Sequence, residues 1–284
     1  MLTQTYTNFE LIIADDGSED KTKEAVLAIS DPRIRLLELP HTGHISKVRN
    51  AGVQAGKGEW VAFLDSDDIW LPDKLQRQME VLKETSKRWC YGRFELMDEQ
   101  GVAIPPKAGI YRPISGWITE QLLANEATVI ICTLLVERSL FDEAGGFSTD
   151  DRLALRGDYE FALRLSIKAE ALALPDLLVR VLEHPGRITR SIKDPNERSA
   201  LPYDIFLEKE QDNKLVRIAK RRKAYLLAEA AVNCSAAGDS RLAWRQLMRS
   251  VRNDSWRHWL SACYRTLRAT FPGRKPLLKT NSES

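Results

Sequence analysis

One segment constrains the fold of this chain more than any other: an apolar run, residues 60–64, ends directly in a cluster of carboxylates. A short apolar run of this length is typical of a buried strand. Asp65, Asp67 and Asp68 follow at its carboxyl end, where open α/β sheets bind their ligands. Because Mg²⁺ and Mn²⁺ prefer oxygen ligands and often bind a substrate's phosphates as well, the cluster indicates a cation site. An acidic surface turn is the alternative for an Asp-x-Asp triplet considered alone.

Strand-like and helical segments alternate over much of the chain, which predicts an α/β fold. The apolar runs expected to form strands are residues 10–15, 33–39, 60–64, 90–98, 127–136 and 177–182. The segments expected to form helices are residues 20–30, 45–55, 73–87 and 158–168. Strands that alternate with helices in this way usually build a mainly parallel sheet with helices on both faces.

The composition changes after residue 200. Residues 201–284 contain 17 Lys/Arg and 8 Asp/Glu, a balance of +9, whereas residues 1–200 contain 25 and 32, a balance of −7. Helical periodicity covers residues 204–235 and 240–270, with a glycine-containing turn between them. We therefore expect an α/β domain over residues 1–200 and a basic helical hairpin over residues 201–284.

The basic hairpin has three interpretations. It packs on the α/β domain through Leu242, Leu247, Met248 and Val251, it contacts an anionic membrane surface, or it binds nucleic acid. The absence of any recognised nucleic-acid module argues against the third. The residues suited to a membrane contact are Arg249, Arg252, Arg257, Arg265, Arg268, Trp256, Trp259 and Tyr264. No apolar run approaches the roughly 18 residues of a membrane span and no signal segment opens the chain, so the expected compartment is the cytoplasm.

The four cysteines are expected to be reduced, buried thiols. Cys90, Cys132, Cys234 and Cys263 show no CxxC spacing. Two of them lie in strand-like apolar runs, where a thiol behaves as a small hydrophobic side chain. This pattern favours core thiols over disulfide bonds or zinc ligands.

Four blocks of sequence, in their order and spacing, resemble the family 2 glycosyltransferases with the GT-A fold. The blocks are Phe9–Asp20, which contains Asp-Asp-Gly-Ser-x-Asp, then Gly43–Gly52 with Ala55–Trp60, then Phe63–Asp68, and finally Gly145–Phe147 with Gly157–Leu165. The resemblance covers about residues 3–195. It implies a GT-A fold, with a mixed, mainly parallel sheet flanked by helices, and a nucleoside-diphosphate sugar as the donor.

The resemblance implies a donor site that includes Asp16. The family position corresponding to Asp16 contacts the nucleotide base, and an Asx-type turn leading into Gly17 is compatible with that role. Arg49 and Lys47 lie near a helix start, from which they could approach the diphosphate. For Lys47, an ordinary solvent-exposed position is the favoured alternative.

The resemblance also implies a Mn²⁺ or Mg²⁺ ion held by Asp67 and Asp65. Asp65 could in addition meet the donor's ribose, and Asp68 is the spare carboxylate of the cluster. His184 falls where related enzymes often carry a late histidine that reaches the metal or the diphosphate. A partly buried, neutral histidine is the alternative for this residue.

Asp158 matches the family's catalytic base. A carboxylate at the start of a helix can be held rigidly near an acceptor hydroxyl and can take its proton. The alternative is an ordinary helix N-cap, for which aspartate is a favoured residue. The family usually has Glu before this Asp, whereas this chain has Gly157, which puts an acceptor contact in doubt.

Family members usually begin with a further strand and most of a helix that do not appear at the amino end of this sequence. Without that strand we expect unpaired strand edges and an opened core. A start codon assigned too late is the explanation we favour, and a fragment with weakened activity is the alternative.

Together these features predict a metal-dependent, inverting glycosyltransferase that moves a sugar onto a saccharide or lipid-linked acceptor, in cell-surface polysaccharide or lipopolysaccharide synthesis. One alternative is a catalytically impaired sugar-nucleotide-binding protein or scaffold. Another is a sugar-phosphate nucleotidyltransferase, but its Gly-rich, Arg-containing phosphate loop is not found. The segment 41–44 spells the HxGH of nucleotidylyltransferases, yet it follows the second recognisable strand, whereas that motif belongs after the first.

Overall fold

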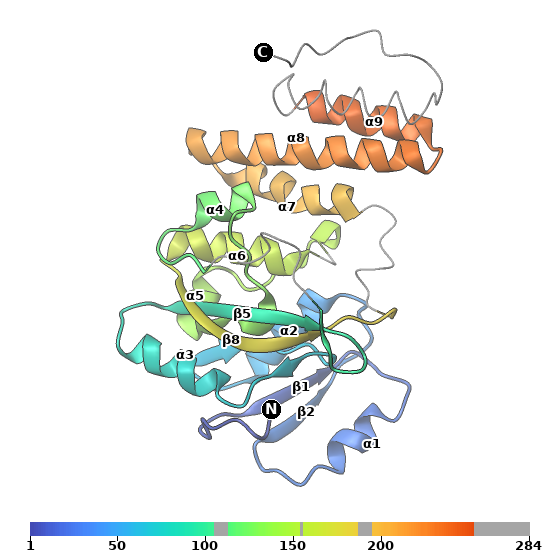
Figure 1. Ribbon diagram of the computed structural model, residues 1–284. Helices are drawn as coiled ribbons and strands as arrows, with labels where there is room; N and C mark the ends of the chain where they lie inside the picture. Colours follow the sequence, from blue (N-terminus) through green and yellow to red (C-terminus); the bar gives the residue numbers. More distant parts are fainter. Residues whose placement is uncertain (105–112, 154–155, 187–194, 253–284) are drawn as a thin grey trace. The chain divides into compact units, whose positions relative to one another are not determined.

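The computed structural model describes residues 1–104, 113–153, 156–186 and 195–252, and the chain forms two compact units, Met1–Ser191 and Ile192–Ser284 (Figure 1). The strands of the first unit are β1 (Leu11–Asp15), β2 (Ile34–Glu38), β3 (Trp60–Ala62), β4 (Ile69–Trp70), β5 (Trp89–Met97), β6 (Ala103–Ile104), β7 (Leu135–Glu137) and β8 (Leu172–Leu182). Its helices are α1 (Thr22–Leu27), α2 (Ile45–Ala55), α3 (Lys74–Lys83), α4 (Thr119–Ala124), α5 (Arg138–Glu143) and α6 (Gly157–Lys168). Two 3₁₀ turns, η1 (Ile131–Thr133) and η2 (Asp151–Leu153), complete this unit.

The strands form a mixed sheet arrangement in two parts. β1 and β2 pair in parallel as one part, and the other has the order β3-β7-β5-β8-β4 with β6 at the side of β5. The two longest ladders, β1 with β2 and β5 with β8, are parallel, and the shorter ladders are antiparallel. Within the described residues, β1 pairs only with β2, and β3 pairs only with β7.

A cluster of four phenylalanines joins the segments that carry the candidate site. Phe63, directly after β3, packs edge-on against Phe147 with ring centroids 5.0 Å apart, and Phe147 lies 4.5 Å from Phe161 of α6. Phe141 of α5 contacts all three rings. All four side chains are buried, so this apolar core holds the end of β3 and the start of α6 in a defined relation.

Asn50 of α2 ties this helix to the segment before α6. Its Nδ2 donates to the backbone oxygen of Phe147 at 2.8 Å, and its Oδ1 accepts from the backbone nitrogen of Phe147 at 2.9 Å. Gly146 has a left-handed φ of +62° and passes so close that a β-carbon would lie 2.9 Å from Asn50 Oδ1. One side chain therefore satisfies both polar groups of a peptide segment that has no strand neighbour.

Asn50→Ala is expected to lower the free energy of unfolding by about 2–3 kcal/mol, because it leaves a part-buried backbone N–H and C=O without partners. Urea unfolding of the variant measures this loss. Gln54→Ala, an exposed change on the same helix, is the matched control and should leave stability within about 0.5 kcal/mol. Equal stability of the two variants would contradict the anchoring role.

The strand expected at 127–136 is largely wrong. The segment folds as η1 followed by the three-residue strand β7. The reason lies in its carbonyl groups: Cys132 O accepts from the indole nitrogen of Trp70, and Thr133 O accepts from Gln78 Nε2, both at 2.8 Å. Side chains of other elements have taken the bonds that a strand neighbour would have made.

The second unit contains α7 (Pro195–Lys209), α8 (Asn213–Ala236) and α9 (Ser240–Val251). The single helix expected at 204–235 is wrong, because it is divided between α7 and α8. Asp212 causes the division: its side chain accepts from the backbone nitrogens of Lys214 and Leu215 and so caps the start of α8. Of the helix expected at 240–270, α9 forms the first part, and residues 253–270 lie outside the described residues, as does Cys263.

α8 lies between α7 and α9 (Figure 1). Small residues allow α8 and α9 to pack closely, since Ala228 and Ala231 of α8 form a buried cluster with Leu247 of α9. Met248 and Val251, which we expected to pack inward with Leu247, are instead exposed. In the described part of the chain, no helix has the length and apolar content needed to cross a bilayer.

Candidate functional site

The carboxylate cluster lies on a tight turn between β3 and β4. The backbone nitrogen of Asp68 donates to the backbone oxygen of Asp65 at 3.1 Å, which closes the turn. Asp65, Asp67 and Asp68 are all half-buried, whereas Ser66 between them is exposed. The turn therefore presents three carboxylates at the end of the strand, as the sequence predicted.

Arg49 reaches this acidic turn from α2. Its Nη2 donates to Asp65 Oδ1 at 2.6 Å, and its guanidinium lies 5.6 Å from the centre of the Phe147 ring. The Arg49 side chain is 13% exposed, so its charge is partly shielded from water. The guanidinium keeps further N–H donors, which suit an oxyanion.

The acidic turn also contacts the end of β8 and the residues that follow it. The backbone nitrogen of Leu182 donates to Asp68 Oδ1 at 3.2 Å, and His184 Nε2 lies 3.1 Å from Asp67 Oδ2. The structure thus brings together two of the predicted residues, Asp67 and His184, that are far apart in the sequence.

Cys132 lies against the same turn and was not predicted to do so. Its thiol donates to Asp68 Oδ2 at 2.8 Å and lies 3.7 Å from Asp65 Oδ2. Burial raises the pKa of Cys132 far above its usual range, and the negative charges of Asp65 and Asp68 act in the same direction. Burial and the neighbouring carboxylates also raise the pKa of Asp68, against the opposing effect of its hydrogen bonds from Cys132 and Leu182.

The donor atoms of the turn fit a hard divalent cation. Ligand atoms of Asp65, Asp68 and Cys132 lie within 4.8 Å of one another. The Cys132 thiol is protonated and is a soft ligand, and it donates a hydrogen bond to Asp68. Mn²⁺ or Mg²⁺ would therefore favour the carboxylate oxygens of Asp65 and Asp67. The imidazole of His184 adds a nitrogen next to Asp67.

Asp16 directly follows β1 and lies in a separate hydrogen-bonded turn. Its Oδ1 accepts from the backbone nitrogen and hydroxyl of Thr42, both at 2.8 Å, and its Oδ2 accepts from the backbone nitrogen of Gly43 at 3.0 Å. Burial raises the pKa of Asp16, but the hydrogen bonds from Thr42 and Gly43 and the nearby His41 outweigh it, so the net pKa is lowered. An ionised carboxylate has about four lone-pair sites, which leaves room for one further donor such as a base N–H.

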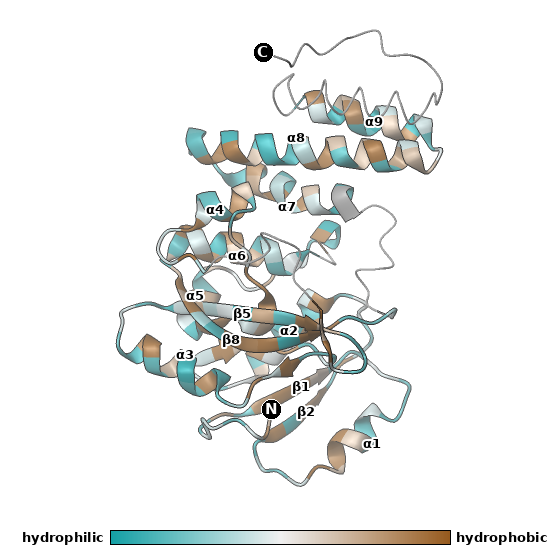
Figure 2. Cartoon of the chain, viewed as in Figure 1, coloured by the Kyte–Doolittle hydropathy of each residue, from teal (hydrophilic) through white to brown (hydrophobic). Residues whose placement is uncertain are grey.

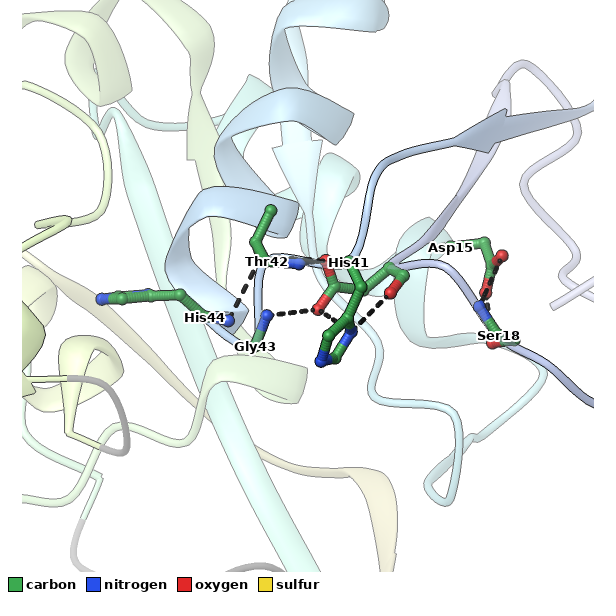
Figure 3. Close-up of polar contacts among 7 residues, drawn as sticks. Asp15, Ser18, His41, Thr42, Gly43 and His44 are labelled. Carbon is green, nitrogen blue, oxygen red and sulfur yellow. Dashed lines mark hydrogen bonds and ion pairs between the residues drawn. The ribbon is translucent and has the colours of Figure 1, made fainter.

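The residues of the HxGH segment therefore serve the turn that holds Asp16. His41 Nδ1 lies 2.8 Å from the backbone oxygen of Asp16, while Figure 3 shows the side chain of His44 pointing away from His41 and Gly43. His44 is buried, and its ring nitrogens have no hydrogen-bond partner among the described residues. Two histidines that point to different surroundings are not the paired histidines of a nucleotidylyltransferase site.

Asp158 is the second residue of α6, and the N-cap position belongs to Arg156. The helix-cap interpretation of Asp158 is therefore wrong. Its Oδ1 accepts from the backbone nitrogen of Tyr159 at 2.8 Å. Gly157 before it is closely approached by α2, since a β-carbon there would lie 2.6 Å from Ser46 Oγ. A larger residue at this position would require the Ser46 hydroxyl to move.

Two predicted residues do not reach the acidic turn. Within the described residues, neither Lys47 nor Asp158 makes a hydrogen bond or ion pair with Asp65, Asp67 or Asp68. Lys47 is exposed in the first turn of α2. Asp158 and the turn are connected through the phenylalanine cluster, since Phe161 follows Asp158 in α6 and Phe63 precedes the turn.

Comparison with known proteins identifies the family and the fold of the chain. The family model described as "Glycosyl transferase family 2" matches residues 1–143, half of the chain, and ends before Asp158. The UDP-Glc:alpha-D-GlcNAc-diphosphoundecaprenol beta-1,3-glucosyltransferase WfgD of Escherichia coli is 37% identical over 145 residues, which cover 50% of this chain and 54% of WfgD. The chain therefore matches about half the length of this curated relative.

Two solved structures share the fold at low sequence identity. The chain is similar to S. aureus TarS 1-349 in complex with UDP-GlcNAc, with a TM-score of 0.69, 15% identity and coverage of 94% of this chain and 82% of TarS 1-349. It is also similar to the mannosyltransferase PcManGT from Pyrobaculum calidifontis in complex with GDP-Man and Mn²⁺, with a TM-score of 0.59, 17% identity and coverage of 95% and 74%. These likenesses show the GT-A fold.

Proposed function

Since the chain belongs to glycosyl transferase family 2, we propose that it transfers a sugar from a nucleoside diphosphate to an acceptor hydroxyl, with inversion at the sugar carbon. The observation that carries this proposal is the acidic turn Asp65–Asp68, held between Arg49 of α2 and His184 after β8. A compact set of carboxylates beside a shielded arginine is suited to binding a diphosphate together with a divalent cation.

In this proposal, Asp65, Asp67 and His184 hold Mn²⁺ or Mg²⁺. When bound, the ion supplies Lewis-acid stabilisation of the charge that develops on the departing diphosphate. Arg49 adds a second positive charge and orients a phosphate oxygen, because its guanidinium is fixed by Asp65 and Phe147. Asp16 accepts a hydrogen bond from the nucleotide base, whereas Lys47, which is exposed, is given no part in the site.

Asp158 acts as the general base of the proposed reaction. The acceptor oxygen forms its bond to the sugar carbon as the bond to the diphosphate breaks, and a carboxylate oxygen of Asp158 takes the acceptor's proton. A single displacement of this kind inverts the configuration at that carbon. The base is held rigidly because Tyr159 N–H binds one of its oxygens.

We infer that the acceptor is a saccharide or a lipid-linked saccharide in cell-surface polysaccharide synthesis, used at the cytoplasmic face of a membrane. The name of the relative WfgD, which specifies a diphosphoundecaprenol acceptor, supports the lipid-linked form.

A panel of UDP- and GDP-sugars with Mn²⁺ tests the proposed function. Release of nucleoside diphosphate from one donor, increased by a saccharide acceptor, is the expected result. Donor binding without any release would identify a sugar-nucleotide-binding protein instead, and the absence of binding to every donor would overturn the proposal.

Asp67→Ala is expected to weaken Mn²⁺-dependent binding of the donor nucleotide by at least about tenfold, since the variant loses a ligand and the contact to His184. Calorimetric titration with UDP or GDP, with and without Mn²⁺, measures this change. Asp73→Ala removes a carboxylate at the start of α3, paired with Arg77, and is the matched control. Unchanged manganese dependence in Asp67→Ala would show that this carboxylate is not a ligand.

A further inference from the structure

Helix α9 has one face that is used inside the second unit. Ala243, Gln246, Leu247 and Ser250 are buried on this face. The hydroxyl of Ser250 donates to the backbone oxygen of Ala224 in α8 at 2.9 Å, which fixes the helix on its neighbour. The orientation of α9 about its own axis is therefore set by packing, which leaves Arg241, Trp244, Arg245 and Met248 exposed.

An apolar strip runs along the solvent side of α9. Trp244, Met248 and Val251 are 40%, 53% and 42% exposed. Their spacing of four and three residues places them on one side of the helix, one above the other. Single exposed apolar residues are ordinary, but three in a line on one short helix form a continuous apolar surface.

A row of arginines borders this strip. Arg241, Arg245 and Arg252 are exposed, and helical spacing places them beside Trp244 and Met248. In the described part of the chain they have no ion-pair partner, and α9 contains no Asp or Glu. Hydrophobic and hydrophilic residues alternate along the helix (Figure 2).

Arg249 behaves differently from these three arginines. Its Nη1 donates to Glu197 of α7 at 2.6 Å, so its charge is paired with a carboxylate of the same unit. The sequence had grouped Arg249 with the residues suited to a membrane contact, and the structure separates it from Arg241, Arg245 and Arg252, whose charges stay available.

We propose that the outer face of α9, formed by the apolar strip and the arginine row, docks on an anionic lipid surface. A helix lying in the interface buries its apolar residues at the boundary of the acyl chains and keeps its cations at the headgroups. Arginine matches the geometry of a headgroup phosphate, and tryptophan favours the interface between water and lipid.

Charge argues against the pairing of two α9 faces from two copies of this chain. Two α9 faces brought together would oppose arginines to arginines, and the helix offers no carboxylate to balance them. Headgroup phosphates supply the missing negative charge. The contact is peripheral, because α9 has 12 residues and a bilayer span needs about 20.

Flotation of the full chain with vesicles tests the proposal. The chain is expected to float with vesicles of phosphatidylglycerol and phosphatidylcholine, less with phosphatidylcholine alone, and less again at high salt. The combined variant Arg241→Gln, Arg245→Gln, Arg252→Gln is expected to bind about 100-fold more weakly, since each of the three cations near such a surface contributes about fivefold. Trp244→Ala with Met248→Ala is expected to lose about tenfold as well.

Matched changes in the first unit are the controls. Trp117→Ala removes another exposed tryptophan, and Lys83→Gln, Arg93→Gln, Lys168→Gln removes the same charge elsewhere. Both controls should float like the unchanged chain, and thermal unfolding should show that every variant is folded. Failure of the unchanged chain to float, or equal flotation of α9 and control variants, would overturn the proposal. The assay uses no sugar donor, so its failure is distinct from failure of the proposed transferase activity.

Discussion

Replacing Asp158 with asparagine is expected to lower the turnover number for sugar transfer by about 10²–10⁴-fold, the usual contribution of a general base. Donor binding should be unchanged, because no described contact joins Asp158 to the acidic turn. Stability should also be unchanged, since the asparagine oxygen can still accept from Tyr159 N–H. Steady-state transfer, nucleotide titration and thermal unfolding measure the three quantities.

Glu160 provides a matched comparison in the same turn of α6. It is the other acid of that turn, but both of its oxygens accept from Arg164 at 2.7 Å and its side chain is 5% exposed. Glu160→Gln should therefore lower the unfolding temperature and leave the turnover of the folded protein near its original value. A loss of turnover in Glu160→Gln with full turnover in Asp158→Asn would reverse the two assignments.

Local sequence signals predict the elements that carry the site. The helix expected at 45–55 is α2 (Ile45–Ala55), and the strand expected at 60–64 contains β3 with the acidic turn directly after it. These signals are strong because they depend on apolar periodicity and on residues adjacent in the chain. Asp65 and Asp67 could be named as candidates for the same reason.

Contacts between distant segments were not predictable in this way. Cys132 meets Asp68, and Thr42 meets Asp16, because separate turns are brought together by packing, and no spacing in the sequence encodes either pair. The contact of Ser46 with Gly157 is of the same kind. Gly157 was visible in the sequence as a departure from the family pattern, but its close approach to Ser46 was not.

Strand β8 shows how a local signal can mislead. β8 begins at Leu172, earlier than the expected 177–182. Pro175 and Asp176 lie inside the strand, although such residues are typical of a strand break. The ladder with β5 absorbs them through a register shift between Tyr91 and Arg93. At that point Gly92 leaves space for Leu178, whose side chain a β-carbon would meet at 2.2 Å.

Lys74, the first residue of α3, is the second group for which a large effect is expected. It is fully buried, its Nζ donates to Gln78 Oε1 at 2.6 Å and lies 3.9 Å from the centre of the Trp70 ring. Burial lowers the pKa of Lys74 to about 7, because Cys90 and Cys132 offset the desolvation only in part. The ordinary pKa of an unfolded lysine is about 10.4.

This lowered pKa predicts a pH dependence of stability. Between about pH 7 and pH 10 the unfolded chain binds more protons at Lys74 than the folded chain does, so the free energy of unfolding rises with pH across this window. Burying the charged form of Lys74 lowers the free energy of unfolding by about 5 kcal/mol below pH 7. This stability is recovered near pH 10, where the amine is neutral in both states.

Lys74→Met should remove this cost and its pH dependence. At about pH 7 the variant is expected to be more stable by about 2–4 kcal/mol, because the loss of the bond to Gln78 Oε1 returns about 1–3 kcal/mol of the 5. At about pH 10 the variant is expected to be less stable than the unchanged chain by about 1–3 kcal/mol, since the neutral amine is no longer costly to bury while the bond to Gln78 Oε1 is still lost. Urea unfolding at the two pH values measures both. Lys83→Met, at an exposed position of the same helix, should leave the pH dependence unchanged, and a Lys74→Met variant with the same advantage at both pH values would show that packing rather than charge burial is responsible.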